Sequence, residues 1–315
     1  MKRRHVIAAI GLALPLLALL GLRCRYGGGE PFVYEPSPAS GGVQLETIAQ
    51  LETPPGNIAI GPQGTVFFTF HPDAHPPYPL AELIDGQARP LRVNGEAVDW
   101  VAPLAMRVDP AGRLWILDTG LHALSLPTLR ALDLETREWV HEHEFTRDEA
   151  PLGAHFNDFR FDASGRHLVI ADASIMAKSP ALVVYDTQSE LARRVLESHE
   201  SLQPGEFIMH VDGEPVTRLG VFSLRPGVDS IAYDPAADQL VYAAMTSPHL
   251  YRLSMSALTD ERLDEAELAA QIERGDRKPV TDGMVADAQG RVYAGDIEHD
   301  GLVRFVRGEV ETLVM

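Results

Sequence analysis

Five segments of this chain repeat one strand pattern, and the repeat restricts the fold more than any other feature. Each segment has an apolar alternating strand, a turn with Asp or Gly, and a second apolar strand. The five segments are 57–71, 105–120, 157–174, 229–247 and 282–297. Their aligned turn residues are Gly61, Asp109, Asp162, Asp234 and Asp287, with spacings of 48, 53, 72 and 53 residues. A strand unit repeated at a period near 50 predicts the blades of a β-propeller.

Each segment has the properties of a β-hairpin. Alternation such as Met106/Val108 places apolar side chains on one face of the first strand. The Gly of the turn is free to adopt a positive φ, and further short strands between the hairpins give about four strands per blade. A doubly wound α/β fold would need a helix between successive strands, and a β-sandwich does not explain the period. The sequence therefore predicts an all-β propeller domain over residues 43–315.

Two stretches interrupt the repeat. Residues 193–224 account for the long spacing and contain Val211-Asp-Gly-Glu-Pro, a turn between short strands. Residues 256–274 have the pattern of one inserted amphipathic helix, with an apolar stripe at Leu258, Leu263, Leu268 and Ile272.

The N-terminus has the pattern of a membrane-targeting segment. Lys2-Arg3-Arg4-His5 precedes an uncharged apolar run of 17 residues, Val6 to Leu22. We interpret residues 1–26 as a signal anchor or a signal peptide and 27–42 as a linker. This places the rest of the chain in the periplasm or outside the cell, with residues 6–22 as its contact with the inner membrane. Cys24 is the single cysteine, so no intramolecular disulfide forms.

The charge of the chain argues against one class of partner. It has 45 acidic and 27 basic residues, a formal net charge of −18. Such a surface repels phosphate backbones, so we expect no nucleic-acid binding. We expect a monomer that takes a small-molecule ligand.

Four motifs, in this order along the chain, resemble the Yellow/major royal jelly protein family and, within it, bacterial members related to L-dopachrome tautomerase. They are Gly112-Arg-Leu-Trp-Ile-Leu-Asp-Thr-Gly120, Phe156-Asn-Asp-Phe159, Gly227-Val-Asp-Ser-Ile-Ala-Tyr233 and Thr281-Asp-Gly-Met284. The resemblance implies a six-bladed propeller, distantly similar to the gluconolactonase and senescence-marker lactonases. It also implies either dopachrome-converting activity or non-enzymatic binding of small aromatic amines.

The repeat departs from that pattern in one respect, because only five units can be counted. Either the strand Val43–Ile48 and other N-terminal residues close the ring, or the last blade is incomplete and a gap remains. An open ring would expose sheet faces and unpaired strand edges.

One register position places polar side chains at the predicted axis. Five residues before each turn residue stand Gly56, Leu104, Asn157, Asp229 and Asp282, with Asn57 one step later in the first unit. We predict a ligand pocket formed by Asn57, Asn157, Asp229 and Asp282. Because Ca²⁺ and similar divalent cations prefer carboxylate and amide oxygens, Asn157, Asp229 and Asp282 are the predicted metal ligands. Asn and Asp at strand starts also cap turns, which is the structural alternative.

The resemblance to the lactonases is incomplete at this position. They have a similar Asn/Asp set, but the Glu that they place in the first unit is replaced here by Pro55-Gly56-Asn57. His155 and Asp158 flank Phe156-Asn157 and, with Asp282, are the predicted groups for acid–base catalysis. The sequence therefore leaves two functions open: a tautomerase or lactone hydrolase, and a binding protein that uses the same pocket.

Overall fold

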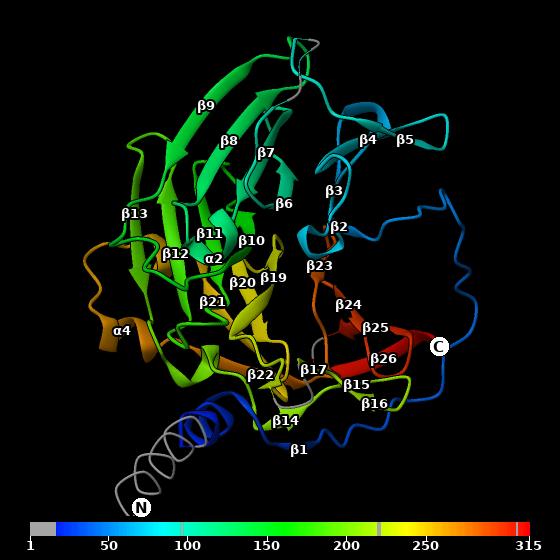
Figure 1. The fold of residues 1–315 in the computed structure, drawn as a ribbon, viewed down its shortest axis with the longest axis vertical. Coiled ribbons are helices and arrows are strands. Elements are labelled where there is room, and N and C mark those ends of the chain that lie inside the picture. Colours follow the sequence, from blue (N-terminus) through cyan, green and yellow to red (C-terminus); the bar gives the residue numbers. More distant parts are fainter. Residues whose placement is uncertain (1–16, 95, 97, 219–221, 307) are drawn as a thin grey trace, which may run out of the picture.

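The computed structural model describes residues 17–94, 96, 98–218, 222–306 and 308–315, and its main feature is five antiparallel four-stranded sheets (Figure 1). Strands follow sequence order within each sheet, so each sheet is one propeller blade. Blade 1 consists of β2 (Pro55–Ile60), β3 (Val66–Phe70), β4 (Leu80–Ile84) and β5 (Gln87–Pro90). Blade 2 consists of β6 (Pro103–Val108), β7 (Arg113–Asp118), β8 (Thr128–Asp133) and β9 (Trp139–Glu144). Blade 3 consists of β10 (Phe156–Phe161), β11 (His167–Asp172), β12 (Ala181–Asp186) and β13 (Leu191–Val195). Blade 4 consists of β19 (Val228–Asp234), β20 (Gln239–Ala244), β21 (His249–Ser254) and β22 (Glu273–Arg277), and blade 5 of β23 (Met284–Ala286), β24 (Val292–Asp296), β25 (Gly301–Val306) and β26 (Glu309–Val314).

The turn aspartates explain why the repeat forms hairpins. Asp109 accepts hydrogen bonds from the backbone N–H groups of Ala111 and Arg113, and from Trp115 Nε1 on the second strand at 2.8 Å. Gly112 follows in the left-handed region at φ +80°. The carboxylate thus satisfies the turn and fixes the second strand, which is why Asp recurs at this position.

Neighbouring blades bury the core between them. The innermost strands pack in the order β2, β6, β10, β19, β23. A separate apolar cluster fills each space between consecutive blades, and the cluster between blades 2 and 3 includes Trp115, Phe156 and Phe159. The prediction of an all-β propeller with five repeats is confirmed.

The sixth blade that the resemblance implies is not confirmed, because the described residues contain five blades. The flanks of blades 1 and 5 remain exposed: Ile58 is 51% exposed, Ile60 58% and Val285 58%. Residues 43–48, a predicted strand that would help to close the ring, have no strand structure and expose Leu45 to 73%.

The single helix predicted over 256–274 is wrong in its extent. The stretch forms two short helices, α3 (Met255–Thr259) and α4 (Glu265–Ala269), and then the beginning of β22. Asp260 leaves the helical region at the end of α3, and Asp264 starts α4 with a capping box to Glu267. Leu258 and Leu268 are buried, as the amphipathic pattern predicts.

Short elements fill the insertion before blade 4. They are η3 (Glu200–Leu202), β14 (Phe207–Ile208), β15 (His210–Val211), β16 (Glu214–Pro215), β17 (Thr217–Arg218) and β18 (Phe222–Ser223). β15 and β16 pair around the predicted Asp-Gly turn. The other short elements are η1 (Pro62–Gly64), η2 (Pro72–Ala74) and α2 (Gly120–Ala123).

The N-terminal segment packs along the bottom of the ring in Figure 1. β1 (Glu30–Pro31) pairs in parallel with β14, and the Ser40 N–H donates to the carbonyl of Thr312 at 2.9 Å. Residues 17–26 are helical. The predicted apolar run 6–22 lies mostly outside the described residues; within these residues, no helix has the length and hydropathy needed to cross a membrane.

Candidate functional site

β-Bulges occur where the predicted polar residues stand on the innermost strands. Pairing of the first two strands is interrupted between Phe156 and Asp158 in blade 3 and between Val228 and Ser230 in blade 4. The interruptions place Asn157 and Asp229 at the bulges, and the same irregularity spans Gly56-Asn57 and Leu104 in blades 1 and 2. A bulge re-aims the side chain of the extra residue, so one backbone feature repeated around the ring produces the polar register.

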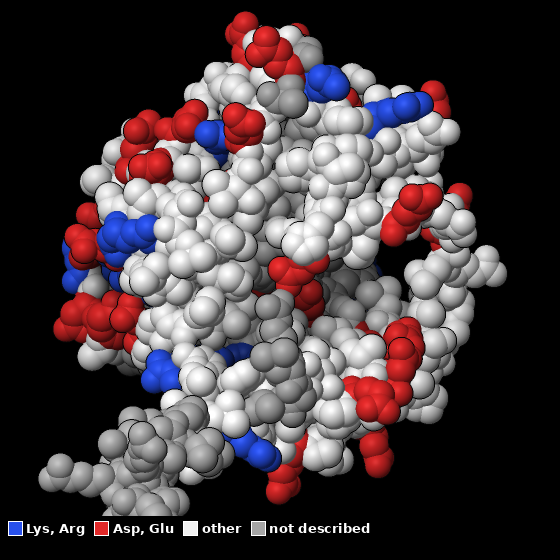
Figure 2. All heavy atoms as spheres, viewed as in Figure 1, with Lys and Arg blue, Asp and Glu red and all other residues white. Residues whose placement is uncertain are grey.

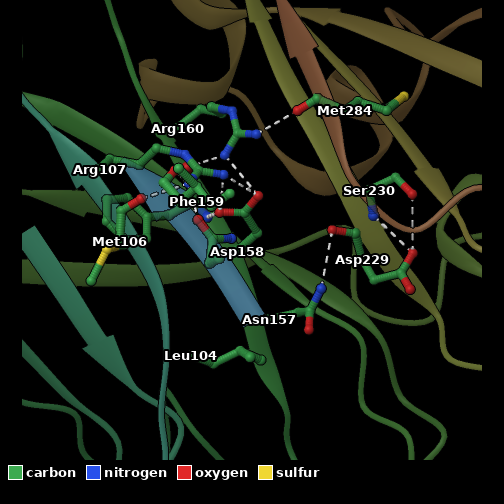
Figure 3. A network of polar contacts seen from close by, with 12 residues as sticks. Leu104, Met106, Arg107, Asn157, Asp158, Phe159, Arg160, Asp229, Ser230 and Met284 are labelled. Carbon is green, nitrogen blue, oxygen red and sulfur yellow. Dashed lines mark hydrogen bonds and ion pairs between the residues drawn. The ribbon is translucent and has the colours of Figure 1, made fainter. Parts of the chain in front are cut away.

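Two arginines and one aspartate form the centre of this site (Figure 3). Asp158 accepts from Arg107 Nη2 at 2.7 and 2.5 Å and from Arg160 Nη1 at 2.7 Å. Arg107 also donates to Asn57 Oδ1 and to the carbonyl of Met106. Arg160 Nη2 donates to the carbonyl of Met284 at 2.5 Å. The two guanidinium groups therefore link the innermost strands of blades 1, 2, 3 and 5.

The network carries more positive than negative charge. The side chains of Arg107, Arg160 and Asp158 are 19%, 10% and 6% exposed. Burial, and next the charge of Arg160, lower the pKa of Arg107 to about 9, although Asp158 acts in the opposite direction. Two cations share one carboxylate in a poorly solvated position, which is an unfavourable arrangement for the cations.

Beside this network, Asp229 lies in a buried acid–lysine group. Its carboxylate accepts from the Ser230 N–H at 2.8 Å, and its carbonyl accepts from Asn157 Nδ2 at 3.4 Å. Burial and the charge of Asp282 raise the pKa of Asp229 well above its usual value. Lys278 is fully buried and donates to the carbonyls of Met245 and Pro279, and burial lowers its pKa to about 7 against the effect of Asp229. These shifts favour the neutral forms of both groups.

Asp282, just before β23, is the third carboxyl group of the predicted pocket. Although Asp282 is exposed at the surface of the fold, the atoms packed around its carboxyl group, and then the negative charge of Asp158, raise its pKa, while the charge of His71 acts in the opposite direction. Ser230 donates its hydroxyl to the backbone carbonyls of Thr281 and Asp282, which holds this segment against β19.

Histidines lie next to Asn157. The rings of His122 and His155 are 4.5 Å apart, centroid to centroid. His122 is held in α2, where all four residues have positive φ, a strained conformation for the non-glycine members. The His155 Nδ1 atom is buried and has no hydrogen-bond partner among the described residues. Burial, then the charges of His122 and His71, lower the pKa of His155 to about 3.

The structure places the predicted site residues close together, near the axial ends of the innermost strands. Asn157 bonds to the Asp229 backbone, Asp158 pairs with Arg107, and Asn57 joins through the same arginine. The charge of Asp282 raises the pKa of Asp229, which indicates that these residues of the last two blades lie near each other.

The sequence reasoning missed Arg107, Arg160 and Lys278. A signal for the two arginines was present, because each stands two residues before its turn aspartate. The other units have Ala59, Ala232 and Val285 at that register.

The predicted metal ligands do not fit a divalent cation in their present arrangement. Across the described parts of the chain, no group of three or more His, Cys, Asp or Glu side chains is placed to hold a metal ion. The carboxylate of Asp229 is directed to Ser230, and two guanidinium groups supply positive charge nearby. Hard cations need converging, unprotonated oxygen ligands, and the site offers arginine donors instead.

Solved structures share the fold at low identity. A gluconolactonase from Xanthomonas campestris has a TM-score of 0.51 and 12% identity, with 92% of this chain and 87% of that chain covered. The calcium-binding protein regucalcin from Agrobacterium tumefaciens also has a TM-score of 0.51, with 14% identity and coverage of 82% and 74%. At this identity the likeness concerns the fold alone.

Sequence relatives lie in one family. Major royal jelly protein 2 of Apis mellifera is 24% identical over 172 residues, 52% of this chain and 37% of the relative. Major royal jelly protein 3 of the same organism is 22% identical over 213 residues, 64% of this chain and 37% of the relative. The chain thus spans little more than a third of the length of these relatives. The family model described as Major royal jelly protein matches residues 101–309, about two thirds of the sequence, and the chain belongs to this family.

Proposed function

We propose that this chain is a small-molecule-binding propeller, with its ligand site at the axial ends of the bulged strands. The observation that carries the proposal is the bulge repeated in blades 1 to 4, because it sets Asn57, Asn157 and Asp229 at one register of the innermost strands at a cost in strand pairing. Figure 2 supports it with a hollow near the centre of the visible face, bordered by acidic residues. A hollow with a few polar side chains near it is typical of a ligand site.

The ligand class is a small polar or aromatic molecule. Asn157 supplies an amide, Asp229 a carboxyl group whose neutral form is favoured, and the paired rings of His122 and His155 supply a flat surface. A protonated carboxyl group donates as well as accepts hydrogen bonds, so it suits a polar ligand without formal charge at that contact.

Binding is better supported than catalysis by His155. A general base works best with a pKa near the working pH, and that of His155 is lowered to about 3. Asp282, with its raised pKa, is the better proton-transfer group for a tautomerisation or for a lactone hydrolysis. Asp158 is bound by two arginines and serves to position them.

Calorimetric titration tests the proposal. The panel contains an aromatic acid, an aromatic amine, a sugar lactone, Ca²⁺ and Mg²⁺. We expect at least one organic ligand to bind wild type and to lose about tenfold in affinity in Asn157→Ala. Glu138→Gln, an exposed position away from the axis, is the control and should leave affinity unchanged. Binding of none of the organic ligands would contradict the proposal, and Ca²⁺ binding that is lost in Asp229→Asn would support the alternative metal site.

Turnover of dopachrome and of the lactone separates an enzyme from a binder. If the chain is an enzyme, Asp282→Asn should abolish turnover with little loss of ligand affinity, because the amide retains the shape and loses the proton. Ligand binding without turnover by wild type would indicate the non-enzymatic function. We propose a periplasmic or extracellular location with the chain monomeric, which fractionation and gel filtration of the full chain would test.

A further inference from the structure

The central arginines have one cation in excess of the acidic groups that they contact. Arg107 and Arg160 both pair with Asp158, and in the described residues neither has an ion pair with a second acidic side chain. Their remaining hydrogen bonds are to neutral oxygens: Asn57 Oδ1 and the carbonyls of Ile58, Met106, Phe159 and Met284. Carbonyl oxygens satisfy hydrogen bonds and leave the net charge in place.

This excess is unusual for the molecule, whose formal net charge is −18. Two further carboxyl groups lie near the network. That of Asp229 is directed to the backbone N–H of Ser230, and that of Asp282 has no ion pair with either arginine among the described residues. A buried cation without a matching anion is costly, so a protein retains one where a ligand supplies the missing charge or where the cation links strands.

Arg107 is the member that a ligand can reach. Its side chain is 19% exposed, about three times the exposure of Asp158 and about twice that of Arg160. In Figure 3, Asn157 and Asp229 lie beside the network, on the same side of Asp158 as each other. Asn157 is thus the neighbour of Asp158, the carboxylate that the two guanidinium groups share.

We propose that the axial ligand carries a carboxylate, which binds to the guanidinium of Arg107 with support from Arg160, while Asn157 contacts an uncharged part of the same molecule. The inference rests on the proposed function and specifies its ligand class. A guanidinium group attracts a carboxylate through its charge, and the interaction is strengthened where water is scarce. The same charges disfavour a cationic ligand, whether an amine or a metal ion.

Matched probes on the full chain test the charge preference without any mutation. Benzoate, benzamide and benzylamine share one ring and differ in charge. We expect benzoate to bind about tenfold or more tightly than benzamide, and benzylamine to bind more weakly than either. Benzylamine or benzamide binding as tightly as benzoate would overturn the inference and leave the proposed function standing. Binding of none of the three would contradict the inference and count against the proposed function.

Variants then assign the preference to Arg107. Arg107→Gln should reduce benzoate affinity about tenfold and leave benzamide affinity unchanged, and Arg107→Lys should lose less because it keeps the charge. Arg166→Gln is the matched control, because Arg166 forms an ion pair of 2.6 Å with Asp186 on the outer part of blade 3. Unchanged benzoate affinity in folded Arg107→Gln would overturn the assignment. If that variant does not fold, the charge preference of wild type still decides the inference.

Discussion

Blades 2 to 5, each of which packs on the blade before it, form the closed side of this propeller, and the uncovered flank of blade 1 is its open side. The two sides have the same sequence repeat and opposite environments. Three residues before the turn residue stand Met106, Phe159, Ile231 and Met284 in blades 2 to 5, and each is at most 3% exposed. The equivalent residue of blade 1 is Ile58, which is 51% exposed. This register faces the preceding blade, and the described structure has no blade before the first. Burial of a propeller strand is thus decided by its neighbour and not by its own sequence.

The largest expected difference comes from truncating this register on both sides. Met106→Ala should lower the free energy of unfolding by about 2–5 kcal/mol, because it leaves a cavity between blades 1 and 2. Ile58→Ala should cost about 0.5 kcal/mol, as for an exposed position. Urea unfolding of the two variants measures the difference. A comparable cost for Ile58→Ala would show that the open flank is covered in solution.

The turn aspartates give a second matched pair. The side chain of Asp109 is fully buried and bonds to Arg113 and Trp115, whereas that of Asp287 in blade 5 is 24% exposed. Asp109→Ala should cost about 2–4 kcal/mol, because it leaves buried N–H groups without acceptors. Asp287→Ala should lower the melting temperature by less, because water replaces the lost acceptor. Equal losses would mean that blade 5 is as well enclosed as blade 2.

Acid should destabilise the closed side through His155. Because its pKa is lowered to about 3 in the folded protein and is near 6.5 when unfolded, its contribution to stability is lost as pH falls below about 6.5. Between pH 6.5 and 5 this amounts to about 2 kcal/mol. Urea unfolding at both pH values should show that the free energy of unfolding decreases less between pH 6.5 and 5 in His155→Gln than in wild type. His75→Asn, at an exposed position of blade 1, is the control. If His155→Gln lost as much free energy of unfolding as wild type, the burial of that ring would be contradicted.

The smallest effect is expected on the flank of blade 5. Val285 is 58% exposed on β23, so Val285→Ser should change the free energy of unfolding by no more than about 0.5 kcal/mol. It should also reduce self-association in light scattering, since exposed strand faces favour aggregation. A loss of several kcal/mol would indicate a partner surface on this flank.

The blades were predictable because their signals are local. Strand alternation, turn aspartates and the Gly of each turn act over a few residues, and Asp109 with Gly112 behaves as its sequence predicts. The helix over 256–274 was wrong because Asp260 and Asp264 form caps, which an apolar stripe does not report. The polar register of Asn157 and Asp229 was also visible, but not the bulges that aim it.

The sequence by itself determined the propeller class, the number of hairpins and the polar residues at the axis, because these follow from short-range patterns. Only the tertiary structure decided which faces are covered and how the axial charges combine. Asp158 and Arg160 lie on one strand of blade 3, and Arg107 of blade 2 joins them only when these blades pack around the axis. Their proximity adds two guanidinium groups beside the predicted metal ligands Asn157, Asp229 and Asp282, since electrostatics depends on distance in space and not on position in the chain.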